Sequence, residues 1–369
     1  MLIQMFRPLT EVSHTFQSNK IGDITTASDF SYEPNFYTYG QFAIRIPFGV
    51  RFANLIEENT LLYVDHKYWL VVRDVVTTID DGTREYEITG TDLKGITTSH
   101  LTLYPSSTLL GAQGYDVATG SSESIMKHYV DYNMINPTDL NRKVISLSNA
   151  NDLNRGVSAD TYMSRFEYVS DVLAKVGKNA QLGYDITVDL TNNKMVFDVL
   201  PAIDKSENQS ERNRVVFDVE RGNVKGIVVE KRSSTGKNAF YATKSGGSLE
   251  ADAVTQLVCD EPVPKGIYRR EMQLNVSCES VEDIEIYARK DIGNYTNVLS
   301  FEQSIRASGF GDIFGLGDIV TIKNRVLGMV QHVQIIGAKI TESDLILVFN
   351  QHSPKLLDLI NQKLKNKGV

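Results

Sequence analysis

The segment from Tyr68 to Asp92 constrains the fold more than any other part of the sequence. Its first half, Tyr68 to Ile79, is dense in β-branched and aromatic residues, and its second half alternates Tyr86 and Ile88 with polar neighbours. Both patterns are typical of strands. The intervening Asp80-Asp81-Gly82-Thr83 predicts a tight turn, because glycine adopts positive φ at no steric cost. We therefore expect a β-hairpin, a feature that indicates architecture more than catalysis.

Asp80 and Asp81 could alternatively bind calcium. A calcium loop of the EF-hand type needs oxygen ligands at alternating positions and a distal glutamate. The sequence around these two residues does not follow that pattern, so we interpret them as turn residues.

Length and charge limit the possible classes of protein. A chain of 369 residues with 41% hydrophobic and 23% charged residues is long enough for two to four globular domains of about 100 to 200 residues each. Its net charge is -8, with a sequence pI near 5.4. Tight binding of nucleic acid is not expected, because neutralising phosphates requires clustered lysine and arginine.

No catalytic, cofactor-binding or metal-binding residue is predicted, and we expect no enzyme and no cofactor. The two cysteines, Cys259 and Cys278, form no CxxC pair and are interpreted as inert buried thiols. The six histidines lack HExxH spacing, and there is no GxSxG motif. The glycine-rich segment from Gly309 to Gly317 has Phe314 where a GxGxxG motif needs glycine, so it is interpreted as a loop. A triad built from distant segments stays open, because triads are recognised by geometry.

The first region, residues 1–105, is predicted to be an all-β domain, a small barrel or sandwich. A strand is expected between Phe30 and Val50, and another from Leu61 to Asp65, with a short amphipathic piece from Arg51 to Glu58 between them.

Residues 106–204 are predicted to form an α+β domain. One helix should begin at Ser121 or Ser122 and stop at Asn136-Pro137. A second should run from Met163 to Val176 and end at Gly177. The strands Tyr184 to Leu190 and Lys194 to Leu200 then predict a hairpin.

The remaining sequence is predicted to contain a loop-rich region, residues 205–298, and a second β domain, residues 299–369. Lys205 to Arg214 contains no apolar residue and is predicted to be a mobile loop or linker. A packing helix is expected from Ser280 to Tyr295. The other predicted elements are strands at Val215–Val219, Gly226–Lys231, Leu299–Ile305, Gly317–Ile322, Val326–Ile340 and Leu345–Asn350, and a helix at Pro354–Lys367.

No stretch of the sequence predicts export or membrane insertion. The N-terminus lacks a long apolar core behind a basic segment, and no window approaches eighteen uninterrupted apolar residues. We expect a protein made in the cytoplasm, with no membrane anchor.

Several short motifs, in order along the chain, resemble one family. The first barrel is suggested by Trp69-Leu70-Val71 and by Tyr86 to Ile96. Tyr129-Val130-Asp131 through Arg142 resembles the helix and loop that follow it. Gly317-Asp318-Ile319-Val320, Ile340-Thr341-Glu342 and the Pro354 helix resemble the last barrel. Together they are similar to the tail-hub proteins of siphophages, the hub module of tail-associated lysins. The family often has an arginine where this chain has His100, which puts a salt bridge there in doubt.

The resemblance implies a β-rich α+β fold, with two small β-barrels and α+β domains between them. It implies a homotrimer in which six barrels match a sixfold tail tube. That ring would close the tube, join the distal tail ring and the receptor-binding proteins, and open so that tape-measure protein and DNA pass without specific binding. The expected location is the virion tail tip or baseplate, after assembly in the host cytoplasm.

A cell-wall-degrading or glycan-binding tail protein is the alternative. Such a protein should show acidic or histidine residues clustered in a cleft, or a row of exposed aromatic residues, and the sequence shows neither pattern clearly. Longer relatives carry a C-terminal hydrolase or fibre, and we expect none after the final helix.

Overall fold

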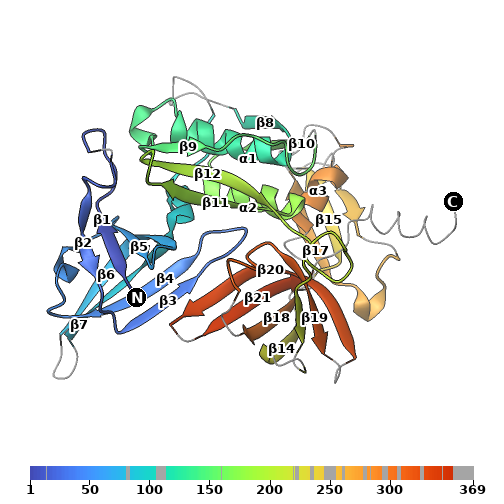
Figure 1. Ribbon diagram of the computed structural model, residues 1–369. Coiled ribbons are helices and arrows are strands. Elements are labelled where there is room, and N and C mark those ends of the chain that lie inside the picture. The colour runs from blue at the N-terminus through green and yellow to red at the C-terminus, as the bar shows by residue number, and fades with distance from the viewer. Residues whose placement is uncertain are drawn as a thin grey trace.

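A computed structural model shows a β-rich α+β protein (Figure 1). It describes residues 1–351 apart from 14, 80–83, 105–113, 159, 219, 221–223, 233–236, 245–254, 260–261, 277–280, 283, 293–297, 306–308, 325–327 and 343. The turn at Asp80 to Thr83 and the helix predicted from Pro354 lie outside these residues.

The first β unit contains the predicted hairpin. Its long strands β6 (Tyr68–Ile79) and β7 (Arg84–Asp92) pair antiparallel from Leu70↔Asp92 to Ile79↔Arg84, with a bulge between Val72 and Asp74. The prediction of two paired strands is therefore confirmed. The other strands are β1 (Ile3–Phe6), β2 (Lys20–Ile24), β3 (Asp29–Glu33), β4 (Gln41–Pro47) and β5 (Leu61–Val64). The predicted piece from Arg51 to Glu58 contains only the short 3-10 helix η1 (Ala53–Leu55), and a second 3-10 helix, η2 (Leu93–Ser99), follows β7.

The α+β unit confirms the predicted first helix and the hairpin. Helix α1 (Ser122–Val130) begins at Ser121, whose hydroxyl accepts a hydrogen bond from the Ser124 amide at 3.0 Å. A π-helical turn, η3 (Asp131–Ile135), extends it as far as Asn136. The other elements are β8 (Asp116–Gly120), η4 (Leu140–Arg142), β9 (Leu147–Asn149), β10 (Asp160–Ser164), α2 (Val169–Ala180), β11 (Leu182–Asp189) and β12 (Lys194–Pro201).

The predicted bounds of the second helix were wrong at both ends. Met163 lies in β10, and Phe166 has a left-handed φ of 56°, so the helix begins only at Val169. It continues through Gly177 to Ala180. A side chain at Gly177 would meet the Leu182 carbonyl oxygen at 2.3 Å, so this glycine permits close packing and does not end the helix.

The second β unit follows the predicted strands closely. It contains β13 (Val216–Asp218), β14 (Val224–Arg232), β18 (Val298–Ile305), β19 (Ile319–Asn324), β20 (Met329–Thr341) and β21 (Leu345–Gln351). A small side unit holds β15 (Ala239–Lys244), β16 (Thr255–Val258), η6 (Gly266–Tyr268) and β17 (Glu271–Val276), covered by α3 (Ile284–Ile292). The helix predicted from Ser280 is thereby confirmed over Ile284 to Ile292.

One ladder of strands joins the two β units. Strand β20 pairs with β3 through Ile340↔Tyr32 and Thr341↔Ser31, which places the first and last parts of the chain side by side (Figure 1). The described strands form one open path, β14-β18-β21-β20-β3-β4-β7-β6-β5-β1-β2, with β19 and β13 attached to β20. Closure of either unit into a barrel therefore stays a prediction.

The segment Lys205 to Arg214 contains no helix or strand, as a loop should, but its start is tied to the second β unit. The Lys205 amide donates to the Ile319 carbonyl at 2.8 Å, and its ammonium group lies 2.8 Å from the Asp318 carboxylate. Glu207 pairs with Lys323 at 2.6 Å. This segment is a tethered loop and not a free linker.

Four apolar clusters form the core of the described residues. One cluster lies inside the first β unit around Ile44 and Ile88. Another lies inside the second β unit around Val320 and Phe349. The largest cluster includes Phe16 and Leu93 as well as α1 and α2, so it packs the first β unit against the α+β unit. The domain limits 105, 204 and 298 remain predictions.

Candidate functional site

Residues 34–40, which we call the joint loop, connect all three large units. The Phe36 amide donates to the Ile336 carbonyl of β20 at 2.8 Å, and the Ala338 amide donates to the Pro34 carbonyl at 3.1 Å. On the other side, the Tyr184 amide of β11 donates to the Phe36 carbonyl at 3.4 Å. The joint loop therefore fixes how the two β units and the α+β unit sit against one another.

Two glycines make room for the Phe36 ring, which is only 2% exposed. A Cβ atom at Gly183 would lie 2.4 Å from the ring, and one at Gly317 would lie 2.3 Å from it. Gly317 also has a φ of 88°, which other residues rarely adopt. Phe36 is thus clamped between the α+β unit and the loop that enters β19.

Tyr37 adds a buried hydrogen bond across the same joint. Its hydroxyl donates to Gln334 Oε1 of β20 at 2.6 Å, and Gln334 Nε2 donates to the Gly317 carbonyl at 3.3 Å. Burial raises the pKa of Tyr37 to about 12. The phenol therefore stays neutral at physiological pH and keeps its proton for Gln334.

Asp92, at the end of β7, holds the far end of the joint loop. Its Oδ2 accepts hydrogen bonds from the Gly40 amide at 2.8 Å and from the Tyr32 hydroxyl at 3.1 Å. The other carboxylate oxygen, Oδ1, is buried and has no hydrogen-bond partner among the described residues. Burial raises the pKa of Asp92 to about 6, and the positive charge of Lys94 partly opposes that rise. A buried carboxylate with an unsatisfied oxygen is costly, so its ionised form weakens the joint.

Lys94 reaches the joint loop from the start of η2. Its ammonium group donates to the Asn35 carbonyl and lies 5.3 Å from the centre of the Tyr184 ring. The residue is only 4% exposed. Lysine is rarely buried to this extent, and the carbonyl and the aromatic ring supply the contacts that make it possible.

His100 lies at a second contact, between η2 and the α+β unit. Its Nε2 is 3.0 Å from the Arg142 carbonyl oxygen, and its Nδ1 is 3.3 Å from the Ile96 carbonyl oxygen. Burial lowers the pKa of His100. The structure thus gives this position two carbonyl partners where the sequence left a salt bridge in doubt.

Within the α+β unit, a buried ion network orders residues 150–157. Glu123, which is fully buried, binds Lys127 at 2.6 Å and accepts from the Arg155 amide at 2.9 Å. Lys127 also donates to the Asn151 carbonyl at 2.6 Å. These charges are paired and hydrogen-bonded, which is how buried charges are tolerated.

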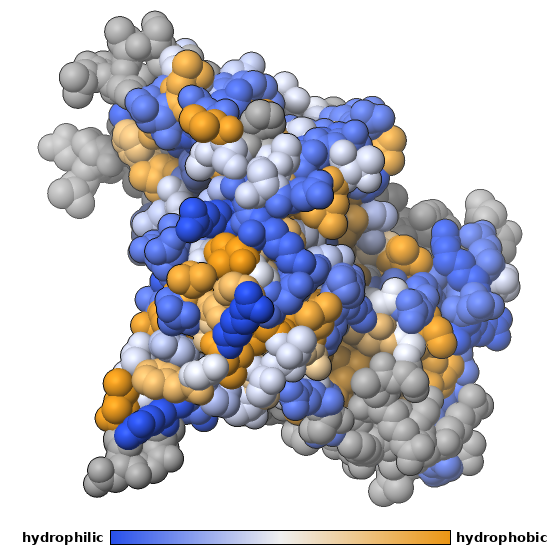
Figure 2. All heavy atoms as spheres, turned by 60° about the vertical axis from the view of Figure 1, so that its left-hand side comes forward, coloured by the Kyte–Doolittle hydropathy of each residue, from blue (hydrophilic) through white to orange (hydrophobic). Residues whose placement is uncertain are grey.

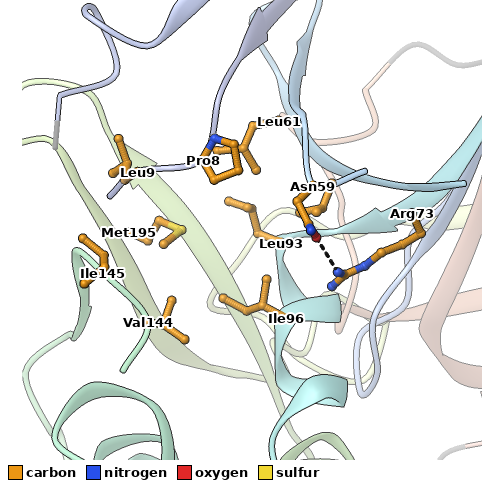
Figure 3. A pocket seen from close by; sticks show the side chains of 11 residues that line it. Pro8, Leu9, Asn59, Leu61, Arg73, Leu93, Ile96, Val144, Ile145 and Met195 are labelled. Atoms are coloured by element: carbon orange, nitrogen blue, oxygen red, sulfur yellow. Dashed lines mark hydrogen bonds between the residues drawn. The ribbon is translucent and has the colours of Figure 1, made fainter. Parts of the chain in front are cut away.

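A pocket of about 190 Å³ lies between the first β unit and the α+β unit (Figure 3). Figure 3 shows mainly apolar side chains around it, with Asn59 and Arg73 on one side. Arg73 Nη1 donates to Asn59 Oδ1 at 2.9 Å. Its other lining residues are Pro8, Leu9, Leu61, Val71, Leu93, Ile96, Val144, Ile145 and Met195.

The described residues that were considered as catalytic or metal-binding candidates lie apart from one another or have structural roles. Among the described residues, no group of three His, Cys, Asp or Glu side chains could hold a metal ion. Cys259 is half-buried, so the prediction of a buried thiol is wrong there, and Cys278 lies outside the described residues. The glycine-rich segment forms a turn in which the Gly311 amide donates to the Phe314 carbonyl at 2.7 Å.

Sequence reasoning missed the joint loop, Asp92 and Lys94. The only local signals were the turn formers Pro34, Asn35 and Gly40, and two charged residues directly after a strand. Neither signal identifies a partner strand about 300 positions away. Within the part of the chain that the structure describes, no helix has the length and apolarity required to span a bilayer.

The fold is that of phage tail proteins. The structure resembles the 43 kDa tail protein of prophage MuSo2 from Shewanella oneidensis, with a TM-score of 0.58 and 14% identity over 95% of this chain and 98% of the other. The tail protein from Neisseria meningitidis MC58 gives 0.54, with 11% identity over 95% and 96%. Prophage tail protein gp18 from Listeria monocytogenes EGD-e gives 0.53, with 12% identity over 99% of each chain.

The sequence defines the family more closely. The profile of the family described as Siphovirus ReqiPepy6 Gp37-like protein matches residues 16–344. This chain belongs to that family, which confirms the resemblance to siphophage tail proteins. No curated protein matches the sequence.

Proposed function

We propose that this chain is a structural hub protein of a phage tail tip or baseplate. Three copies form a ring that closes the tail tube, and the ring links the distal tail protein to the receptor-binding proteins. On host attachment the ring opens, and tape-measure protein and DNA pass through it without specific binding.

One observation carries the proposal. Two β units of one chain are held edge to edge by β3 and β20, in a fold shared along almost the whole length with proteins named as tail proteins. If each unit occupies one position around a ring, three copies supply six positions, which fits a sixfold tube. The joint loop supports this arrangement because it holds the two units at a fixed distance and angle.

The buried joint residues also favour a mechanical role. The hydrogen bonds of Phe36 and Tyr37 cross between structural units, whereas Asp92 and Lys94 hold the joint loop from within the first β unit. A cell-wall-degrading or glycan-binding tail protein is the competing function.

Light scattering after size-exclusion chromatography tests the proposal. We expect one species with three times the 41.3 kDa chain mass, and ring-shaped particles with six lobes in negative-stain electron microscopy. The same preparation should leave purified cell walls undegraded and should not be retained by them. A stable monomer that hydrolyses or binds cell wall would overturn the proposed function.

A further inference from the structure

The Asp92 carboxyl group binds both ends of the joint loop. Tyr32, whose hydroxyl donates to Asp92 Oδ2 at 3.1 Å, lies in β3 just before the loop. Gly40, whose amide donates to the same oxygen at 2.8 Å, is the last residue of the loop. A Cβ atom at Gly40 would lie 2.8 Å from the Glu33 carbonyl oxygen, so the two ends of the loop are in close contact. One oxygen atom therefore holds the start and the end of the segment that connects the two β units.

The strand pairing between the two β units is short and includes one of these residues. Among the described residues, β20 pairs with β3 at two positions, one of which is Ile340↔Tyr32. A single bridge also links Asn35 of the joint loop to Gly337 of β20. Tyr32 thus takes part both in the pairing with the second β unit and in the hydrogen bond to Asp92. A change at Asp92 therefore acts directly on the strand that carries the second β unit.

The surroundings of Asp92 favour the neutral form of its carboxyl group. Hydrophilic side chains are spread over the face of the molecule shown in Figure 2, whereas Asp92 is only 5% exposed. Its Oδ2 accepts two hydrogen bonds, but its Oδ1 is buried and has no partner among the described residues. Ionisation spreads the negative charge over both oxygens and leaves part of it on Oδ1, which is costly in an interior of low polarity. The neutral group avoids that cost and still accepts both hydrogen bonds at Oδ2.

Charged and titratable groups approach Asp92 from three elements. Tyr32 comes from β3, Lys94 from η2, and Tyr184 and Asp185 come from β11. Burial is the main cause that raises the pKa of Asp92 to about 6, Lys94 opposes the rise, and the negative charge of Asp185 adds to it. Both tyrosines stay neutral in this range, because burial raises their pKa values further above it. Asp92 is thus the group at this joint whose charge is expected to change near pH 6.

We propose that Asp92 is a pH-sensitive switch, which fixes the joint loop when its carboxyl group is neutral and loosens both ends of the loop when it is ionised. The direction follows from proton linkage. A carboxyl group whose pKa is higher in the closed joint than in solvent stabilises the closed joint at low pH, and this contribution is lost as the pH rises through about 6. Above that pH the joint loop opens more often, and the two β units are coupled less rigidly. The inference concerns a single chain and does not depend on the proposed ring.

Hydrogen–deuterium exchange of the full-length protein, measured by mass spectrometry between about pH 5 and pH 7.5, tests the switch. The readout is the protection of peptides that contain the Phe36, Gly40 and Ala338 amides, which donate hydrogen bonds at the joint. Each rate is divided by the intrinsic exchange rate at the same pH. If the carboxyl group returns to its ordinary pKa of 3.8 when the loop opens, wild-type protection should fall about tenfold over this interval. Asp92→Asn, a neutral side chain of the same shape, should remove this pH dependence.

Three further variants assign the response to its group. Asp116→Asn is the matched control, because Asp116 is only 2% exposed and also has a buried oxygen without a partner among the described residues, but lies in β8 beside His128. His100→Gln removes the titratable ring at the other end of η2. Both should keep the wild-type pH dependence. Asp185→Asn removes a negative charge that raises the pKa of Asp92, so it should move the midpoint of the response to lower pH. Circular dichroism checks that each variant is folded.

Wild-type protection that does not change with pH overturns the switch, and so does an equal change in Asp92→Asn. If Asp92→Asn does not fold, the wild type and Asp185→Asn decide, because an unchanged midpoint in Asp185→Asn also contradicts the proposal. Loss of the pH dependence in Asp116→Asn or His100→Gln would overturn it as well, since the response would then belong to another group. Exchange at the joint loop is measured within each chain, so a failed switch leaves the proposed ring standing, and a monomeric protein would leave the switch standing.

Discussion

At the scale of single residues, two glycines constrain the joint most strongly. Gly183 and Gly317 have no side chain, and the Phe36 ring fills the space that a side chain at either position would need. A sequence shows these residues only as glycines, and glycine is equally common in turns that contact nothing.

Gly317→Ala is expected to destabilise the protein strongly. The methyl group would lie 2.3 Å from the Phe36 ring, and φ of 88° is unfavourable for alanine. Gly49→Ala is the matched control, because Gly49 has a φ of 84° but nothing within 4 Å of the added atom. We expect about 1 kcal/mol for Gly49→Ala from the backbone alone, and roughly 2 kcal/mol or more beyond that for Gly317→Ala. Urea unfolding of both variants measures the difference, and equal losses would contradict the clamp at Phe36.

Asp92 should make stability depend on pH in a defined direction. Its pKa is raised from 3.8 to about 6 in the folded chain, so the folded state holds a proton that the unfolded state has lost over this range. The contribution of Asp92 to stability is therefore complete below pH 3.8 and is lost as the pH rises through about 6. A pKa difference of about two corresponds to about 3 kcal/mol.

The Asp92→Asn variant isolates this effect from other titrating groups such as His100. We expect the free energy of unfolding of the wild type, measured relative to Asp92→Asn, to fall by about 2 kcal/mol between pH 4 and pH 8, because part of the full effect is already lost at pH 4. Urea unfolding at several pH values checks this. Parallel pH curves for the two proteins would show that Asp92 titrates normally.

At the scale of elements, periodicity predicted most of the helices and strands. The hairpin around Asp80 to Thr83, helix α1 and the strands of the second β unit follow from apolar spacing and turn residues. The bounds of α2 did not, because Met163 and Phe166 fall at helical spacing by coincidence while the backbone there is extended or left-handed.

The long distance in sequence between interacting elements also explains why no site could be predicted. The pairing of β3 with β20 is long-range, and neither strand carries a signal for its partner. The same holds for the pocket, whose walls come from the N-terminal segment, β5, β6, η2 and β12. Local patterns predict elements, whereas contacts between distant elements are decided by packing of the whole chain.

At the scale of the whole molecule, the joint should make the two β units unfold together. Trp69 is the single tryptophan and stacks on Tyr63 at 4.4 Å in the first β unit. Its fluorescence therefore reports that unit, while far-UV circular dichroism reports all strands. We expect the two signals to give the same urea midpoint for the wild type.

Phe36→Ala should separate the two transitions. The substitution removes a buried ring at the meeting point of three units, with a cost of about 3 to 5 kcal/mol, and it weakens the coupling between the β units. Tyr39→Ala, a half-buried residue of the same loop, serves as the control and should keep one midpoint. Coincident midpoints in Phe36→Ala would mean that the β3 and β20 ladder alone couples the units.

The pairing of β3 with β20 also has a consequence for synthesis on the ribosome. Tyr37 and its partner Gln334 are 297 positions apart, so the β3 edge of the first unit stays open until the ribosome has translated the long intervening segment as far as β20. An open strand edge can pair with another nascent chain. Because distant pairings form slowly, the nascent chains of this protein are most exposed to misassembly during the interval before β20 emerges.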